Sequence, residues 1–158
     1  MSEELDRLAF TFFKLFAQYE YALKAMKYAH VGRYGQVELE WDRYSNEIGT
    51  LILIDDDEHI QRAVNYLFDN PPKKQVIRQG KLDWKSVNTE VRSPKVLFEH
   101  IRRVRNNLYH GGKFNDNWLE PQRSTELISN SLIILQALKE KDANLAAAIH
   151  GNCPNKQD

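Results

Sequence analysis

The clearest structural element of this chain runs from Ser93 to Lys113, with the sequence SPKVLFEHIRRVRNNLYHGGK. Ser93 is a favoured N-cap residue, and Pro94 suits the first position of a helix. Apolar side chains follow at steps of three and four and form one stripe: Leu97, Ile101, Val104 and Leu108. The glycine pair Gly111–Gly112 follows the stripe, as a left-handed C-cap requires. This pattern predicts an amphipathic helix that ends near His110.

The N-terminal stretch from Leu5 to Ala29 has the same helical periodicity. Its apolar positions are Leu5, Leu8, Phe12, Leu15, Phe16, Tyr19, Leu23 and Met26. The block from Phe10 to Phe16 is apolar on more than one face, which is typical of a helix that packs on two sides. We therefore expect one side to face the core and the other to face a partner subunit.

Three further helices are predicted at Glu40–Leu53, His59–Phe68 and Ser124–Leu138, and residues 142–149 could extend the last one. The segments between them, Val31–Glu38, residues 73–92 and Lys113–Gln122, resemble loops, the second with one short helical or extended piece. The expected fold is all-α: a four- to five-helix up-down bundle with an inserted irregular segment. Residues 1–150 would form one domain, and residues 151–158 would be a frayed tail.

Composition excludes several classes of protein. With 158 residues, 42% hydrophobic and 28% charged, the chain has the size and composition of one globular domain. Its 22 basic and 22 acidic residues give no net charge, which argues against a polybasic protein held to nucleic acid by bulk charge. The single cysteine, Cys153, excludes an internal disulfide framework and a Cys-based zinc site. The acidic start and the lack of about 18 consecutive apolar residues predict a cytoplasmic protein without a membrane partner.

The segment around residues 102–110 carries the candidate chemistry. On a helical wheel of about 100° per residue, one polar arc holds Arg102, Asn106, Tyr109 and His110, with Arg105 beside it about 140° from His110. Arginine matches phosphate oxygens, and histidine transfers protons near neutral pH. Arg102, Tyr109 and Lys113 are therefore candidates for contacts with RNA or phosphate. The plainer alternative is that these basic residues and His110 favour the helix dipole near its C-terminus.

The string RNNLYHGGK, from Arg105 to Lys113, resembles the signature of the HEPN superfamily (higher eukaryotes and prokaryotes nucleotide-binding domains). That signature is an arginine, often followed by a polar residue, and a histidine four to six residues further on, near a helix end. Together with WDRY at Trp41–Tyr44, it resembles a stand-alone, plasmid-encoded branch of the superfamily.

The resemblance implies a helical homodimer in which the two motif copies share one cleft. Many active members of the superfamily are metal-independent endoribonucleases, so the resemblance implies an enzyme without a cofactor that acts as a toxin or defence effector. Carried over here, Arg105 would polarise the scissile phosphate, His110 would act as general acid or base, and Asn106 would orient one of them. The 5–29 helix and the motif helix would form the dimer, and an antitoxin protein is a possible partner. The alternative is a non-catalytic dimer that binds nucleotide, RNA or a protein.

Other polar features have plainer interpretations. The acidic run Asp55–Glu58 fits a helix cap better than a metal site, and the histidines lack metal-ligand spacing. Glu20 could face the motif, although a surface position is the default. Trp118 could stack on a base or pack under its loop. The basic cluster Lys73, Lys74 and Arg78 could widen an RNA-binding surface or be a solvated loop.

Overall fold

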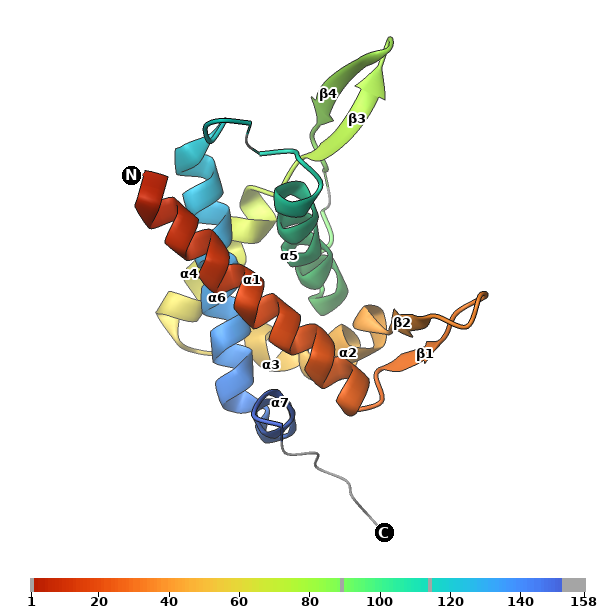
Figure 1. The fold of residues 1–158 in the computed structure, drawn as a ribbon. Coiled ribbons are helices and arrows are strands. Elements are labelled where there is room, and N and C mark those ends of the chain that lie inside the picture. The colour runs from red at the N-terminus through yellow and green to blue at the C-terminus, as the bar shows by residue number, and fades with distance from the viewer. Residues whose placement is uncertain (1, 89, 114, 152–158) are drawn as a thin grey trace.

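The computed structural model describes residues 2–88, 90–113 and 115–151, and this part of the chain is mostly helical (Figure 1). The helices are α1 (Ser2–Ala25), α2 (Trp41–Ile48), α3 (Thr50–Leu53), α4 (Glu58–Asp69), α5 (Pro94–Tyr109), α6 (Pro121–Lys141) and α7 (Ala143–Ile149). The strands are β1 (Ala29–Val31), β2 (Val37–Leu39), β3 (Lys74–Arg78) and β4 (Lys81–Lys85). Of the described helices, none has the length and apolar character needed to cross a membrane. The predicted tail beyond Gly151 lies outside the described residues.

The helices pack around a core in which α1 crosses α6 (Figure 1). Helix α1 also contacts α7, α4 packs on α6, and α2 packs on α5. The predicted helical character of the chain is therefore confirmed. A purely all-α bundle is wrong, because the described chain also forms two antiparallel hairpins, β1–β2 and β3–β4.

Both hairpins lie where the sequence predicted loops. The segment Val31–Glu38 contains the turn of β1–β2, and residues 73–92 contain all of β3–β4. In the second hairpin, Gln79 and Gly80 have φ values of 52° and 74°. Two consecutive residues with positive φ form the turn that matches the twist of paired strands. Short strands between such turns have too few residues to show a clear two-residue period, so the pattern was not evident.

Helix boundaries differ from the predictions at three places. Helix α1 ends at Ala25 rather than Ala29, because the chain turns back at Lys27, whose φ is 65°. The predicted helix at Glu40–Leu53 is divided into α2 and α3 at Gly49.

The last predicted helix also differs. Helix α6 begins at Pro121, so Ser124 lies inside the helix and is not its N-cap. Proline is favoured at the first helical position, which explains the earlier start. Residues 143–149 form the separate helix α7, and the Asp142 carboxylate caps it by accepting from the Asn144 and Leu145 amides.

The start and end of α5 follow the sequence closely. The Ser93 hydroxyl accepts a hydrogen bond from the Val96 amide at 3.2 Å, and Pro94 is the first helical residue. At the other end His110 is the C-cap, and Gly111 has the left-handed φ of 72° that ends a helix without strain. The candidate motif therefore occupies the last turns of a helix with defined ends.

Aromatic packing fixes α5 against α1 and α2. The Phe16 ring of α1 stacks on Trp41 at 5.2 Å, and Trp41 lies 6.0 Å from Phe98 of α5. Gly49 allows this approach, since a Cβ there would lie 3.1 Å from the Pro94 Cβ and 2.5 Å from the Ser45 carbonyl oxygen. The first turns of α5 thus pack directly against the backbone at Gly49.

Helix α1 has one buried and one exposed aromatic face. Phe12 is fully buried, whereas Phe10, Phe13 and Tyr21 are exposed by 65%, 46% and 58%. The rings of Phe10 and Phe13 lie 6.2 Å apart, and Phe13 meets the edge of Tyr109 of α5 at 5.5 Å. The exposed rings Phe10, Phe13 and Tyr109, which we call the outer aromatic patch, fit the expectation that a second side of this helix is apolar.

We expect Phe12→Ala to lower the free energy of unfolding by about 3–5 kcal/mol, because it leaves a cavity in the core. The control is Tyr21→Ala on the same helix, which should change it by less than about 0.5 kcal/mol. Urea unfolding monitored by circular dichroism measures both. Equal effects of the two substitutions would contradict the assignment of the buried face.

Candidate nucleic-acid site on α5

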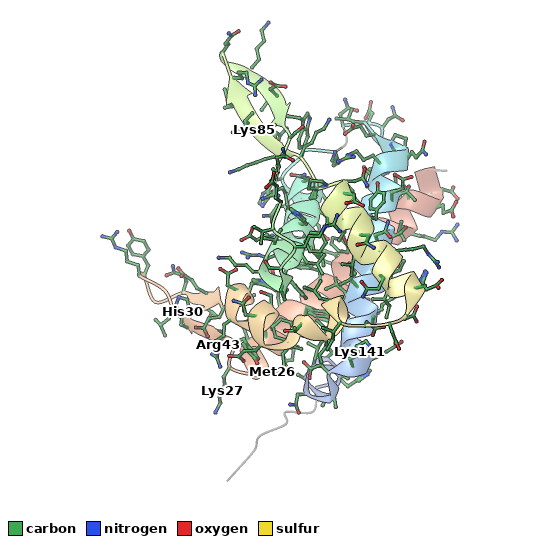
Figure 2. The ribbon with its side chains drawn as sticks, turned by 180° about the vertical axis from the view of Figure 1, so that it is seen from behind. Met26, Lys27, His30, Arg43, Lys85 and Lys141 are labelled. Atoms are coloured by element: carbon green, nitrogen blue, oxygen red, sulfur yellow. The ribbon has the colours of Figure 1, made fainter. Side chains whose placement is uncertain are left out.

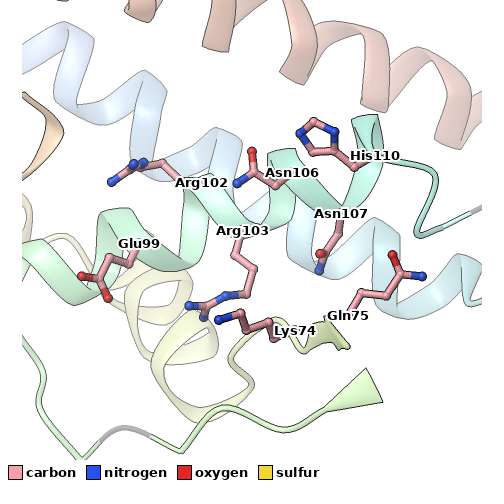
Figure 3. Close-up of a pocket in the computed structure, with 8 residues that line it drawn as sticks. All are labelled: Lys74, Gln75, Glu99, Arg102, Arg103, Asn106, Asn107 and His110. Carbon is pink, nitrogen blue, oxygen red and sulfur yellow. The ribbon is translucent and has the colours of Figure 1, made fainter. Parts of the chain in front are cut away.

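The polar face of α5 borders an open cavity of about 450 Å³ at the base of the β3–β4 hairpin. Figure 3 shows its lining: Lys74, Gln75, Glu99, Arg102, Arg103, Asn106, Asn107 and His110. The apolar stripe of α5, including the buried Ile101 and Val104, turns these polar side chains away from the core. The cavity thus combines three cations and a histidine with one carboxylate and three amides.

Arg105 lies on another side of the helix, facing α1. Its Nη1 donates to Asn106 Oδ1 at 3.0 Å, and its Nη2 is 3.9 Å from Glu20 Oε1. The guanidinium also lies over the rings of Phe16 and Tyr109, at 5.6 and 5.3 Å from their centroids. Glu20 therefore faces the motif, and Arg105 is held against α1 by charge and by ring contacts.

The structure brings part of the predicted site together. Arg102, Asn106 and His110 line the same cavity, whereas Arg105 does not. Asn106 connects the two groups, because it borders the cavity and accepts from Arg105. Within one chain, the candidate catalytic residues Arg105 and His110 thus lie on different sides of α5, as the helical wheel predicts.

Tyr109 and Arg102 both have neighbours of their own. Partial burial raises the pKa of Tyr109, and the nearby Arg105 opposes that rise. Arg102 lies over Trp41 at 5.8 Å, with its Nη1 3.9 Å from the Asp42 carboxylate. Tyr109 remains 42% exposed beside Arg105, and Arg102 is also accessible, so both side chains can reach a ligand.

Lys113 is placed apart from the cavity. The side chain is 5% exposed, its Nζ donates to Glu120 Oε2 at 2.9 Å, and it lies 4.6 Å from the Trp84 ring centroid. The ammonium holds the pKa of Glu120 below its usual range. Lys113 thus joins the loop before α6 to the β3–β4 hairpin. To make the phosphate contact expected from the sequence, its side chain would have to leave Glu120 and Trp84.

Four cavity residues were not among the predicted site residues: Gln75, Glu99, Arg103 and Asn107. Asn107 fixes the hairpin to α5, because its Nδ2 donates to the Lys73 carbonyl at 2.9 Å. The only sequence feature that pointed to this side of the cavity is the Lys73–Lys74 pair, a candidate for part of a wider RNA-binding surface. Its proximity to α5 depends on the hairpin, which the sequence pattern did not predict.

The WDRY string has a structural explanation in each of its residues. Trp41 and Tyr44 are buried in the core. Asp42 reaches α5, where its carboxylate lies 3.0 Å from Lys95 Nζ. The Arg43 guanidinium donates to the Glu40 and Glu47 carboxylates, and its position beside Lys27 and His30 is visible in Figure 2. These contacts support α2 rather than a second polar site.

The other polar candidates are also accounted for. The Asp57 carboxylate accepts from the His59 amide and caps α4, as predicted, while Asp55 pairs with Lys141. The Trp118 Nε1 donates to Asp6 Oδ1 at 2.8 Å, which ties its loop to α1. Among the described residues, no group of three His, Cys, Asp or Glu side chains has an arrangement that could hold a metal ion.

Comparison of the chain with protein-family models, with curated proteins and with solved structures gave no match. The functional argument therefore depends on the geometry of α5 and on the resemblance of its motif.

Behind the cavity lies a buried histidine, His100, which is 1% exposed. Its Nδ1 is 3.4 Å from Arg103 Nη1, its ring meets the edge of Phe68, and its Nε2 has no hydrogen-bond partner in the described chain. Burial, reinforced by the charge of Arg103, lowers the pKa of His100 from 6.5 to about 4. His100 is therefore neutral in the folded protein at neutral pH.

We expect the free energy of unfolding to fall as the pH drops from about 7 to about 4, because the unfolded chain binds a proton at His100 before the folded chain does. The lowered pKa of His100 corresponds to a loss on the order of 3 kcal/mol at pH 4 and below, whereas above pH 6.5 no stability is lost. His100→Gln should reduce this pH dependence, and His59→Gln, at an exposed position of α4, should not. Urea unfolding at a series of pH values measures it, and parallel curves for wild type and His100→Gln would contradict the assignment.

Proposed function

We propose that this protein is a metal-independent endoribonuclease of the HEPN type, a toxin or defence effector whose active site forms between two copies of the chain. The observation that carries the proposal is the cavity on α5, where Arg102, Asn106 and His110 lie together beside Arg103 and Lys74. Cations that surround a histidine and amide side chains suit a phosphodiester substrate better than a neutral small molecule.

The chemistry requires RNA. The ribose 2′-oxygen attacks the phosphorus, the bond from phosphorus to the 5′-oxygen breaks, and a 2′,3′-cyclic phosphate is left. His110 accepts the proton of the 2′-hydroxyl as general base, or donates one to the leaving 5′-oxygen as general acid. Arg105 stabilises the charge on the phosphate, and Asn106 orients Arg105 through the hydrogen bond between them.

A homodimer reconciles this chemistry with the positions of Arg105 and His110 on different sides of α5. The outer aromatic patch, Phe10, Phe13 and Tyr109, lies directly beside Arg105. Exposed aromatic side chains that touch one another favour association with another protein surface. For the proposed site to form, a second copy seated there must place its own His110 beside Arg105.

A second candidate is a non-catalytic dimer that binds RNA, nucleotide or a protein. This candidate is favoured by the contacts of Arg105 with Glu20, Phe16 and Tyr109, because they give the side chain a structural role. The two candidates differ in the role of His110, which only the first requires for function.

We expect the wild-type protein to cleave RNA in the presence of EDTA and to leave cyclic-phosphate ends. His110→Ala and Arg105→Ala should each lower the rate by at least about 100-fold, because proton transfer and charge stabilisation are lost. Gel analysis of labelled RNA, with end-group identification, measures this. Lys95→Gln, at the far end of α5, is the control and should retain activity. If all four proteins bind RNA and none cleaves it, the second candidate replaces the first.

A site shared between subunits predicts complementation. A mixture of Arg105→Ala and His110→Ala chains forms mixed dimers with one intact Arg105–His110 site, so about a quarter of the wild-type activity should return. The mixture must be refolded together to allow subunit exchange, and each variant refolded alone is the control. Activity that stays at the level of the single variants would show that both residues must come from one chain.

A further inference from the structure

The β3–β4 hairpin projects from the helical body (Figure 1), and its base lies next to the cavity. Its register places most of its cations on one face. The strands pair in the register Lys74↔Lys85, Val76↔Asp83 and Arg78↔Lys81. Directly paired residues share a face, and so do alternate residues along a strand. One face therefore carries four exposed basic side chains: Lys74, Arg78, Lys81 and Lys85.

The opposite face is mostly apolar. There, Gln75 pairs with Trp84, and Ile77 pairs with Leu82. Ile77 and Leu82 are 75% and 74% exposed. Residues 73–85 contain five basic residues and one acid, on a chain with no net charge. The Asp83 carboxylate lies 3.3 Å from Arg78 Nη1, so the other cations outnumber the acid on the same face.

Two pairs of like charges lie directly opposite one another in this ladder, Lys74 with Lys85 and Arg78 with Lys81. Such pairs destabilise a two-stranded sheet, which is itself marginal in water. A polyanion that binds along the face removes this repulsion. The arrangement is therefore explained by a ligand with regularly spaced negative charges.

The basic face continues into the cavity. Lys74 belongs to both, and Figure 3 shows its ammonium pointing toward the Arg103 guanidinium. Lys85, paired with Lys74, lies at the base of the hairpin in Figure 2. The strands extend the basic surface by about 16 Å beyond the cavity. A linear polyanion held at His110 can thus follow the basic side chains along the hairpin.

We propose that the basic face of β3–β4 binds the sugar-phosphate backbone of an RNA strand that passes through the cavity beside His110. This inference rests on the proposed function and extends it, because it assigns the enzyme to RNA longer than the cleavage site. The contacts are with phosphates, so they add affinity without selecting a sequence.

The test uses a fluorescent 20-nucleotide oligouridine with 2′-O-methyl groups, which block cleavage, and measures its affinity for the protein at several salt concentrations. Lys81→Gln/Lys85→Gln should bind roughly tenfold more weakly at 0.1 M salt, with a salt slope less negative by about 1.4. Arg33→Gln/Arg62→Gln removes the same charge elsewhere and should match the wild type. Thermal unfolding of the hairpin variant should not occur earlier than that of the wild type, since two repulsive neighbours are removed.

A dinucleotide substrate, too short to reach the hairpin, separates this inference from the proposed function. Unchanged dinucleotide cleavage by Lys81→Gln/Lys85→Gln, with weaker binding of the 20-mer, supports both. Weaker binding without any cleavage by the wild type overturns the ribonuclease proposal and supports the hairpin contact. Equal 20-mer affinities for the hairpin variant and its control overturn the hairpin contact. Failure of the wild type to bind the 20-mer, with binding of polyglutamate instead, also overturns it in favour of an acidic protein partner.

Discussion

The stack of Phe16, Trp41 and Phe98 determines how the rest of the molecule is arranged. It joins α1, α2 and α5 through rings that bury large apolar areas, and aromatic contacts of this kind fix orientation as well as distance. Because α5 is seated at Gly49 and held by this stack, its two polar sides have fixed directions. One side faces α1 with Arg105, and the other lines the cavity with His110.

This division means that, within one chain, the two residues proposed to be catalytic lie in different environments. Arg105 is positioned by α1, through Glu20 and the Phe16 ring, whereas His110 follows the helix end at Gly111. Asn106 touches both environments. In the proposed dimer, one helix therefore carries both residues that would contact the second copy and residues that would contact the phosphodiester.

Local signals made much of this arrangement predictable from the sequence. The Ser93 cap, the stripe from Leu97 to Leu108 and Gly111 predicted α5 closely, because each acts through neighbours in the chain. The wheel also placed Arg105 and His110 on different sides. The place of the β3–β4 hairpin beside α5 and the buried position of Lys113 could not be predicted in this way. They depend on Trp84, Glu120 and Lys73, which come near α5 only in the folded chain.

The β3–β4 hairpin is attached to the domain mainly at its base, where Asn107 holds the Lys73 carbonyl. Its two ends are neighbours in the ladder, only about 5 Å apart. The stretch from Val76 to Asp83 can consequently be shortened, lengthened or exchanged for another arm while the ends still meet. The outer part of the hairpin can thus change in length or sequence without disturbing the packing of the helices.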